Sequence, residues 1–300
     1  MLQLTNEFKN SVITALLEVR KNFDGTDAAF ARQWGINGSV FNRMKTGETE
    51  QILKDGKWLS LGRELGVSMS ERRWNTAKTE VFKTIEEDVL FCKEYAKGRI
   101  CVDDCGIGKT YTAQYLSRSL KNCFYVDASQ AKTKQLFIRL IAQRIGLDST
   151  GRFADVKANI KYYIKMLPNP IIIIDETGDL DYPAFLELKE LWNGTDGACG
   201  WYLIGADGLR AKIERGINGR KVGYRELFSR YSERYTSVVP TGNHDRLQFY
   251  RKLITDVLEV NMQDKSLLPT ILKKCLTTDG SGYVGGLRRA ESLLILNMEA

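Results

Sequence analysis

Hydrophobic residues follow two different patterns along the chain, and the change between them divides the sequence into parts. From Asn6 to Asn22, apolar residues recur at helical spacing, which predicts a helix with one buried face. The same pattern returns from Thr76 to Tyr95 and in the tail that begins near Asn243. Short continuous apolar runs are typical of buried strands in a parallel sheet, and they occupy residues 99–102, 123–126, 171–174, 200–206 and 236–239. The sequence therefore predicts an α/β fold with helical parts at both ends.

Residues 26–47 predict two short helices joined by a tight turn. The first begins at Thr26 or Asp27, and the second runs from Ser39 to Lys45. This arrangement is typical of a helix-turn-helix, in which exposed early residues of the second helix meet the major groove of DNA. The expected DNA contacts are Ser39, Asn42, Arg43 and Lys45. The alternative is a small helical bundle that only docks, and residues 1–75, with eleven basic and nine acidic side chains, carry only +2. We therefore do not expect this part to bind DNA tightly alone.

A glycine-containing segment, DDCGIGKT at 103–110, separates the first strand from the helix that follows it. A strand, such a loop and a helix in this order form a phosphate-binding loop, in which glycine lets phosphate oxygens approach the backbone N–H groups. Lys109 is expected to reach the β- and γ-phosphates, and the Thr110 hydroxyl to bind Mg²⁺. The expected ATP contacts of this segment are Cys105, Gly106, Ile107, Gly108, Lys109, Thr110 and Tyr111.

Asp103 stands where the G-x-x-x-x-G-K-T pattern has its first glycine. Because this position is the outermost of the loop, we expect an altered first turn in a working site.

A second element of nucleotide chemistry follows the strand at 171–174. Asp175 and Glu176 stand at its carboxyl end. Asp175 is expected to hold Mg²⁺ through water, and Glu176 to polarise the water that attacks the γ-phosphate. Together with the phosphate-binding loop, in this order and each after a strand, the pair predicts a nucleotide hydrolase.

Three further charged residues extend the predicted site. Asp207 follows the strand at 200–206, where a sensor of the γ-phosphate would lie, although Ala206 beside it leaves the alignment open. Arg230 and, as second choice, Arg234 precede the strand at 236–239, and such arginines can reach a neighbouring subunit's ATP. The alternative for both is an ordinary surface or DNA-facing charge.

A G-x-L-R string, Gly285 to Arg288, opens the last helix. It resembles the second sensor of AAA+ ATPases, with Arg288 reaching the nucleotide from a lid. From Thr76 onward the chain resembles an AAA+ module with its motifs in family order. The resemblance implies three parts: residues 1–70 as a helix-turn-helix domain, 71–242 as the AAA+ nucleotide-binding core, and 243–300 as a helical lid.

A helix-turn-helix domain in front of a compact AAA+ module resembles the family of phage Mu B transposition proteins and their bacterial relatives. The resemblance implies an ATP- and Mg²⁺-dependent protein, encoded by a phage or a bacterium. It would form helical homo-oligomers on double-stranded DNA of any sequence, mark that DNA as a target and activate a partner transposase. Hydrolysis would then release the DNA.

The distribution of charge suggests where DNA would bind. The net charge is +7, and residues 209–235, with eight basic and three acidic side chains, carry +5 of it. Such an excess suits a polyanion, although a charge run is also typical of a solvated surface. The candidates for phosphate contacts outside the helix-turn-helix are Lys132, Lys134, Arg220 and Lys221.

Composition excludes other chemistry. The longest aliphatic run is too short to span a membrane, and the N-terminus has no signal-peptide pattern, so we expect a soluble, cytoplasmic protein. The six cysteines form no CxxC pair and are expected to be reduced thiols, mostly in the core. The only histidine, His244, lacks a nucleophile motif beside it and is expected on the surface.

Two other functions remain open at this point. A helicase loader or replication initiator would prefer single-stranded DNA or a helicase, but the chain shows no aromatic-rich stacking loop. A nucleotide-switched transcription regulator would read an operator with residues 1–70.

Overall fold

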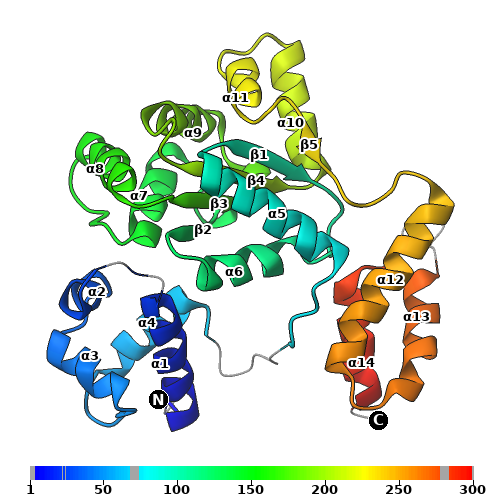
Figure 1. Cartoon of the computed structure of the whole chain (residues 1–300), viewed down its shortest axis with the longest axis horizontal. Helices are drawn as coiled ribbons and strands as arrows, with labels where there is room; N and C mark the ends of the chain where they lie inside the picture. Colours follow the sequence, from blue (N-terminus) through cyan, green and yellow to red (C-terminus); the bar gives the residue numbers. More distant parts are fainter. Residues whose placement is uncertain (1–3, 22, 24, 68–73, 278–283, 299–300) are drawn as a thin grey trace.

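The computed structural model of the chain describes residues 4–21, 23, 25–67, 74–277 and 284–298. Its centre is a five-stranded parallel sheet in the order β2-β3-β4-β1-β5 (Figure 1). The strands are β1 (Gly98–Val102), β2 (Cys123–Asp127), β3 (Ile171–Asp175), β4 (Gly200–Gly205) and β5 (Tyr235–Thr236). The α/β class predicted from the sequence is therefore confirmed.

Helices cover both faces of the sheet, which explains why its strands are continuously apolar. In β3, Ile171 and Ile173 pack against α5 (Glu80–Tyr95) and α6 (Lys109–Ser119). Ile172 and Ile174 point to the other face, because side chains alternate along a strand. That face is covered by α7 (Lys134–Ile145), α8 (Phe153–Met166), α9 (Tyr182–Gly194), α10 (Asp207–Asn218) and α11 (Tyr224–Arg230).

The last strand is shorter than predicted. The apolar run at 236–239 predicts a strand, but β5 contains only Tyr235 and Thr236. The N–H groups of Val238 and Val239 donate to the carboxylate of Asp103, so they are not available to a β-ladder. The prediction is wrong because a side chain far away in the sequence takes these donors.

The N-terminal bundle consists of α1 (Asn6–Lys21), α2 (Asp27–Gln33), α3 (Gly38–Lys45) and α4 (Asp55–Leu65), around buried Phe30, Phe41 and Trp58. The two helices predicted for the helix-turn-helix are present as α2 and α3. The Thr26 hydroxyl caps α2, and the Asn37 side chain caps α3. The fourth helix has no counterpart in the prediction.

The C-terminal helical unit consists of α12 (Asn243–Asn261), α13 (Leu268–Leu276) and α14 (Leu287–Met298). It corresponds to the helical tail that the sequence predicts from near Asn243. It has its own core, which includes Ile254, Leu258 and Ile271. Single 3₁₀ turns, η1 (Ala128–Gln130), η2 (Thr177–Asp179) and η3 (Lys265–Leu267), complete the described elements. Ser70 at the predicted domain boundary and Tyr283 before α14 lie outside the described residues.

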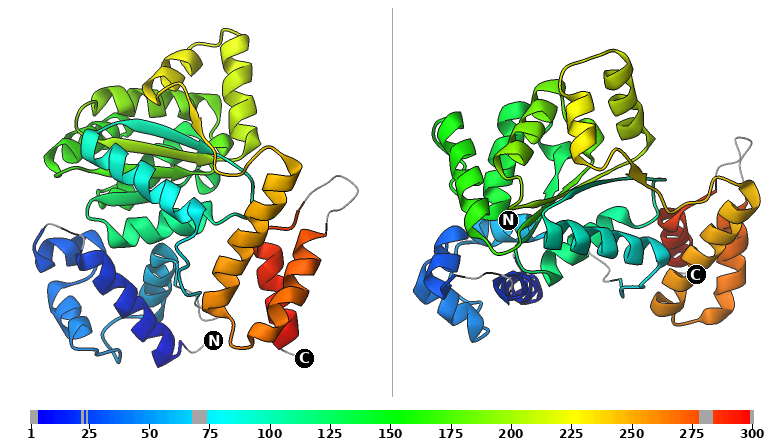
Figure 2. Two further views of the ribbon diagram at one scale, coloured as in Figure 1. Left: turned by 45° about the vertical axis from the view of Figure 1, so that its right-hand side comes forward. Right: turned by 45° about the horizontal axis from the view of Figure 1, so that its top comes forward.

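The two helical parts lie at one end of the sheet domain, and α10 and α11 project from the other end (Figures 1 and 2). The N-terminal bundle contacts the core through α1, which lies against α6, and through Arg144, whose guanidinium donates to the Glu64 carbonyl at 3.1 Å. Within the described residues, no helix is long and apolar enough to cross a membrane.

Candidate active site

The loop between β1 and α6 has the backbone that phosphate binding requires. Gly106 and Gly108 have φ angles of +74° and +100°, which lie in the region that favours glycine. Gly108 is the N-cap of α6, so the first N–H groups of that helix face the space above the loop. The Lys109 ammonium donates to the carbonyl of Asp103 at 2.8 Å and to that of Asp104. The loop therefore holds its lysine at the site where phosphate would lie.

Asp103 gives the loop an altered first turn. Its side chain is only 5% exposed, and its carboxylate accepts hydrogen bonds from the N–H groups of Asp104, Val238 and Val239. These donors satisfy a charge that would otherwise be costly to bury. A glycine could not make these bonds, so Asp103 fastens the loop to the segment after β5.

The residues predicted to bind Mg²⁺ lie together. The Thr110 hydroxyl donates to Asp175 Oδ2 at 2.6 Å, and the Tyr125 hydroxyl donates to the same oxygen at 3.1 Å. Burial, followed by the charge of Asp175, raises the pKa of Tyr125, so this phenol stays protonated as a donor. A hydroxyl and a carboxylate at the mouth of a phosphate-binding loop fit Mg²⁺, which prefers oxygen ligands and keeps several waters. When bound, the ion would neutralise charge on the phosphates.

Glu176 lies beside this pair in a left-handed conformation, with φ +49°. Its N–H donates to Asp175 Oδ1 at 2.9 Å, which fixes the backbone at the strand end. Burial, followed by the charge of Asp175, raises the pKa of Glu176. A carboxylate with a raised pKa beside the phosphate site suits a base that orients or deprotonates water.

A single cavity of about 330 Å³ unites these groups. The loop, Asp175, Glu176 and Ala206 line it, and Arg288 at the start of α14 lines it from the C-terminal unit. Cys105 and Tyr111, both predicted contacts, also line it. Cys105 is the one exposed cysteine, and the other five are buried, as expected for reduced core thiols.

Sequence reasoning missed the wall opposite the loop. The segment before α5 and the start of that helix contribute to the cavity, with Trp74 donating to Glu291 of α14 at 2.9 Å. The hydroxyls of Thr76 and Tyr111 are 2.6 Å apart. The available signal in the sequence was Trp74, an aromatic residue six positions before the start of α5. The missed lining residues are Trp74, Asn75, Ala77, Thr79, Phe82, Thr112, Gly205, Val257, Leu287 and Glu291.

Asp207, Arg230 and Arg234 do not line this cavity. Asp207 is exposed at the first turn of α10, and Ala206 takes the place at the cavity. Arg230 donates to the Asn193 side chain at 2.6 Å and lies over Trp192, while Arg234 is exposed. Both arginines therefore lie outside the nucleotide cavity of their own chain.

The residues predicted to contact DNA differ in whether they already have a partner within the chain. Four of the cations are in ion pairs: Arg43 with Glu48, Lys45 with Asp27, Lys132 with Asp179, and Lys134 with Glu187. Ser39 and Asn42 are exposed on α3, and Ser39 bonds to Asn37. Arg220 and Lys221 lie in the loop between α10 and α11 and make no ion pair with a described residue, although the Lys221 ammonium lies over the Tyr182 ring, 3.9 Å from its centroid.

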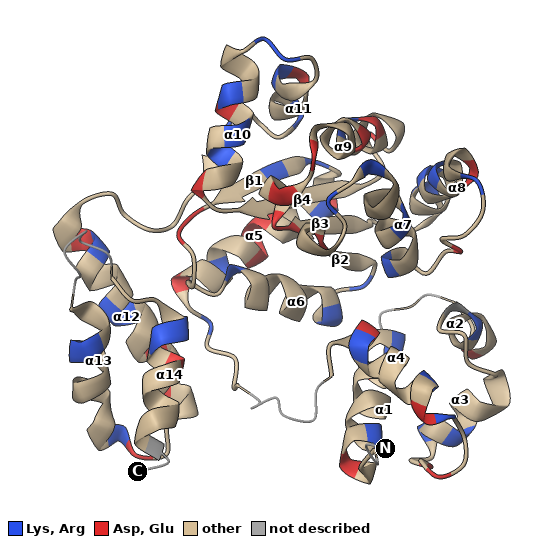
Figure 3. Ribbon diagram, turned by 180° about the vertical axis from the view of Figure 1, so that it is seen from behind, with Lys and Arg blue, Asp and Glu red and all other residues tan. Residues whose placement is uncertain are grey.

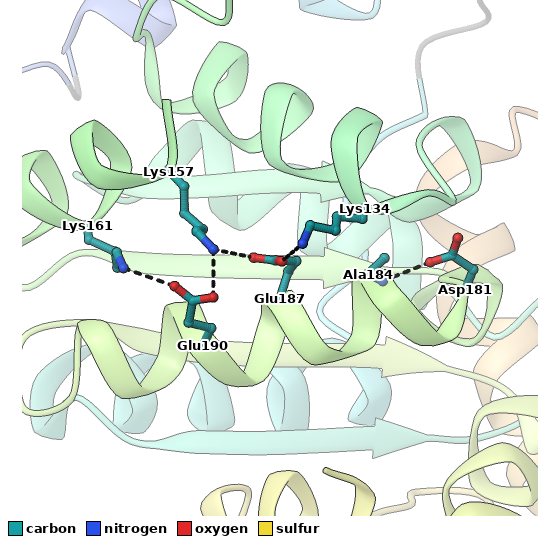
Figure 4. A network of polar contacts seen from close by, with 7 residues as sticks. All are labelled: Lys134, Lys157, Lys161, Asp181, Ala184, Glu187 and Glu190. Atoms are coloured by element: carbon teal, nitrogen blue, oxygen red, sulfur yellow. Dashed lines mark hydrogen bonds and ion pairs between the residues drawn. The ribbon is translucent and has the colours of Figure 1, made fainter. Parts of the chain in front are cut away.

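The pairing around Lys134 is part of a network between three helices (Figure 4). Glu187 of α9 is 5% exposed and accepts from Lys134 of α7 and from Lys157 of α8. Glu190 accepts from Lys157 and Lys161. Burial alone would lower the pKa of Lys157, but the hydrogen bonds to Glu190 and Glu187 raise it overall, so it remains a cation. The basic residues of α7 and α8 in this network therefore hold the core together.

The part of the chain that carries the site is similar to a known family. The family described as "AAA domain" matches residues 96–213, from just before β1 into α10. Residues 96–213 thus form an AAA domain, and the protein is a P-loop ATPase. No curated protein matches the chain. The N-terminal bundle, Arg230, Arg234 and the C-terminal unit lie outside the matched residues.

Proposed function

We propose that this P-loop ATPase assembles in an ATP-dependent way on double-stranded DNA of any sequence and marks it as a target for a partner transposase. The observation that carries the proposal is an exposed basic surface without ion pairs among the described residues, on a hairpin whose first helix follows Ala206 of the nucleotide cavity. This surface is the α10–α11 hairpin, which comprises α10, α11 and the loop between them. Its exposed cations without an ion pair among the described residues are Arg215, Arg220, Lys221 and Arg225.

Figure 3 shows basic residues on α10 and in the loop that leads to α11. Exposed cations that lack acidic partners attract phosphates of any sequence, and they give a binding energy that depends on salt. Because the hairpin projects from the core, a duplex could reach it without meeting the N-terminal bundle (Figure 1).

The base of the hairpin contacts the catalytic turn. The Lys212 ammonium of α10 donates to the carbonyls of Gly178 and Leu180, which belong to the turn directly after Glu176. Burial lowers the pKa of Lys212, although the charges of Asp179 and Asp181 oppose this shift. A change at Glu176 during hydrolysis can thus be transmitted to the hairpin. This contact supports nucleotide control of DNA binding.

Assembly would multiply a weak contact. One hairpin offers few cations, but a row of subunits on one duplex repeats them, and the linked contacts bind far more tightly than one. In this arrangement Arg230, with Arg234 as the second choice, acts on the ATP of the neighbouring subunit.

The test is fluorescence-anisotropy binding of the full chain to mixed-sequence duplex and to single-stranded DNA. Each DNA is titrated with an ATP analogue, with ADP and without nucleotide. Tight duplex binding only with the ATP analogue supports the proposal. Nucleotide-independent binding of one operator sequence would instead indicate a transcription regulator, and a preference for single strands would indicate a helicase loader.

A further inference from the structure

Asp104, the second residue of the phosphate-binding loop, makes contacts that phosphate binding alone does not require. Its side chain is half-buried and does not line the nucleotide cavity. Its carboxylate Oδ2 accepts a hydrogen bond from the Tyr250 hydroxyl at 2.6 Å and forms an ion pair with Arg246. Both partners belong to α12, the first helix of the C-terminal unit.

This contact is built into the packing of α12. The Tyr250 ring is 1% exposed, and the Arg246 guanidinium lies 5.6 Å from its centre. Charge-assisted hydrogen bonds are stronger and more directional than neutral ones. Since one carboxylate oxygen meets both donors, α12 cannot move away from the loop without breaking both.

The backbone of the same residue holds the phosphate-binding lysine. The carbonyls of Asp103 and Asp104 accept from the Lys109 ammonium. Asp104 thus faces α12 with its carboxylate and Lys109 with its carbonyl. Because the two groups belong to one residue, a displacement of α12 shifts the oxygen that positions the lysine.

A second contact fastens the other end of the C-terminal unit to the loop. The Leu287 N–H, at the start of α14, donates to the Gly106 carbonyl at 2.8 Å. Gly286 packs so closely that an added Cβ would lie 2.8 Å from that carbonyl oxygen. The first and last helices of the C-terminal unit therefore both hold the loop.

We propose that Asp104 is a positioning residue for ATP binding, which couples the C-terminal unit to Lys109 through Arg246 and Tyr250. Loss of this link leaves the catalytic groups Thr110, Asp175 and Glu176 in place. It weakens nucleotide binding because Lys109 loses its fixed position. Hydrolysis at saturating ATP changes much less.

The test measures the affinity for a fluorescent ATP analogue and the steady-state ATPase rate of the full chain without DNA. The variants are Asp104→Asn, Arg246→Gln and the double variant. Each single change is expected to raise Kd and KM about tenfold, a typical size for coupling between two sites, while kcat falls less than about threefold. The double variant should be no weaker than the weaker single variant, because both changes break one link.

Arg251→Gln is the matched control, since Arg251 is an exposed arginine on the same helix. It should leave Kd unchanged. Tyr250→Phe removes only a hydroxyl. If Asp104→Asn does not fold, the Kd and KM values of Tyr250→Phe and Arg246→Gln test the proposal in its place. Unchanged Kd values with a lower Tm, or effects that multiply in the double variant, would overturn the proposal. DNA is absent from these measurements, so their outcome is independent of the proposed DNA binding.

Discussion

The cations predicted to contact DNA differ between the N-terminal bundle and the α10–α11 hairpin, although exposed cations without an ion pair among the described residues also occur in the bundle, at Arg32, Lys54 and Arg63. In the bundle, Asp27 accepts from Arg20 and Lys45, each at 2.7 Å, and Glu48 pairs with Arg43. In the hairpin, Arg220 and its neighbours have no acidic partner among the described residues. A cation already paired gains less from a phosphate, because the pair must first be broken. The pairing of basic residues is therefore a better guide to a surface for polyanions than their number.

The hairpin and the bundle also differ in how close their contacts with the core lie to the nucleotide cavity. The hairpin begins beside Ala206 at the cavity and contacts the turn after Glu176. The bundle meets the core through Arg144 at the end of α7 and lies against α6, where Arg118 of the last turn approaches Gly66. We therefore expect nucleotide state to control what the hairpin binds and to have little influence on the bundle.

The largest expected effect is on hydrolysis. Glu176→Gln removes the carboxylate that we propose orients the attacking water, so it should lower kcat by at least about 100-fold, while ATP still binds. Because release then stops, the complex with duplex DNA should last longer. A malachite-green phosphate assay and anisotropy chase experiments measure both.

Lys109→Ala is the companion variant. It should fail earlier, at nucleotide binding or assembly, and so should lose the DNA complex. If Glu176→Gln hydrolysed ATP normally, the assignment of the catalytic glutamate would be wrong.

The next effect separates the two basic regions directly. Arg220→Glu with Lys221→Glu should weaken duplex binding roughly tenfold or more and reduce its salt dependence, since each lost phosphate contact lowers the salt slope by about one. The matched control is Arg43→Glu with Lys45→Glu, which makes the same charge change in the bundle. Equal losses in the two double variants would contradict the comparison.

The pH dependence should also differ between the nucleotide site and the N-terminal bundle. Burial and the charge of Asp175 raise the pKa of Glu176, so kcat should fall with decreasing pH at values above the ordinary range of a glutamate. Hydrogen bonds from Lys45 and Arg20 lower the pKa of Asp27, so the ion pairs of the bundle persist until lower pH. A kcat profile from pH 5 to 8 checks the first statement, and a flat profile over that range would contradict it.

The smallest expected effect is an increase in affinity for duplex DNA. Asp27→Asn with Glu48→Gln frees the cations of α3, and exposed ion pairs are weak, so duplex affinity should rise by at most about fivefold. Anisotropy at low salt detects such a change, and Glu18→Gln on α1 is the control for loss of an exposed carboxylate. A large gain would show that the bundle is a masked DNA reader.

The sequence predicted the parts of the site that depend on local order. The loop at 103–110 and the acids after β3 follow strands, and parallel strands bring their carboxyl ends together at one edge of the sheet. Thr110 and Asp175, which are 65 positions apart, could therefore be placed together before the structure was known.

Contacts between distant side chains could not be predicted in the same way. The roles of Asp103, Asp104 and Tyr125 depend on partners that no spacing rule connects to them. The ion pairs that Lys132 and Lys134 form with acidic residues could not be predicted either. Such pairs depend on how α7 and α9 pack, and a charge count does not contain that information.

The most direct test of the central claim is a salt titration of duplex affinity for the full chain, with two unrelated DNA sequences, in the presence of an ATP analogue or ADP. With the analogue, we expect log Kd to rise steeply and linearly with log salt, and the two sequences to give the same line. With ADP, binding should be lost across the range. Affinity that stays flat with salt, or that differs strongly between the two sequences, would contradict an ATPase that holds DNA through unpaired cations and phosphates.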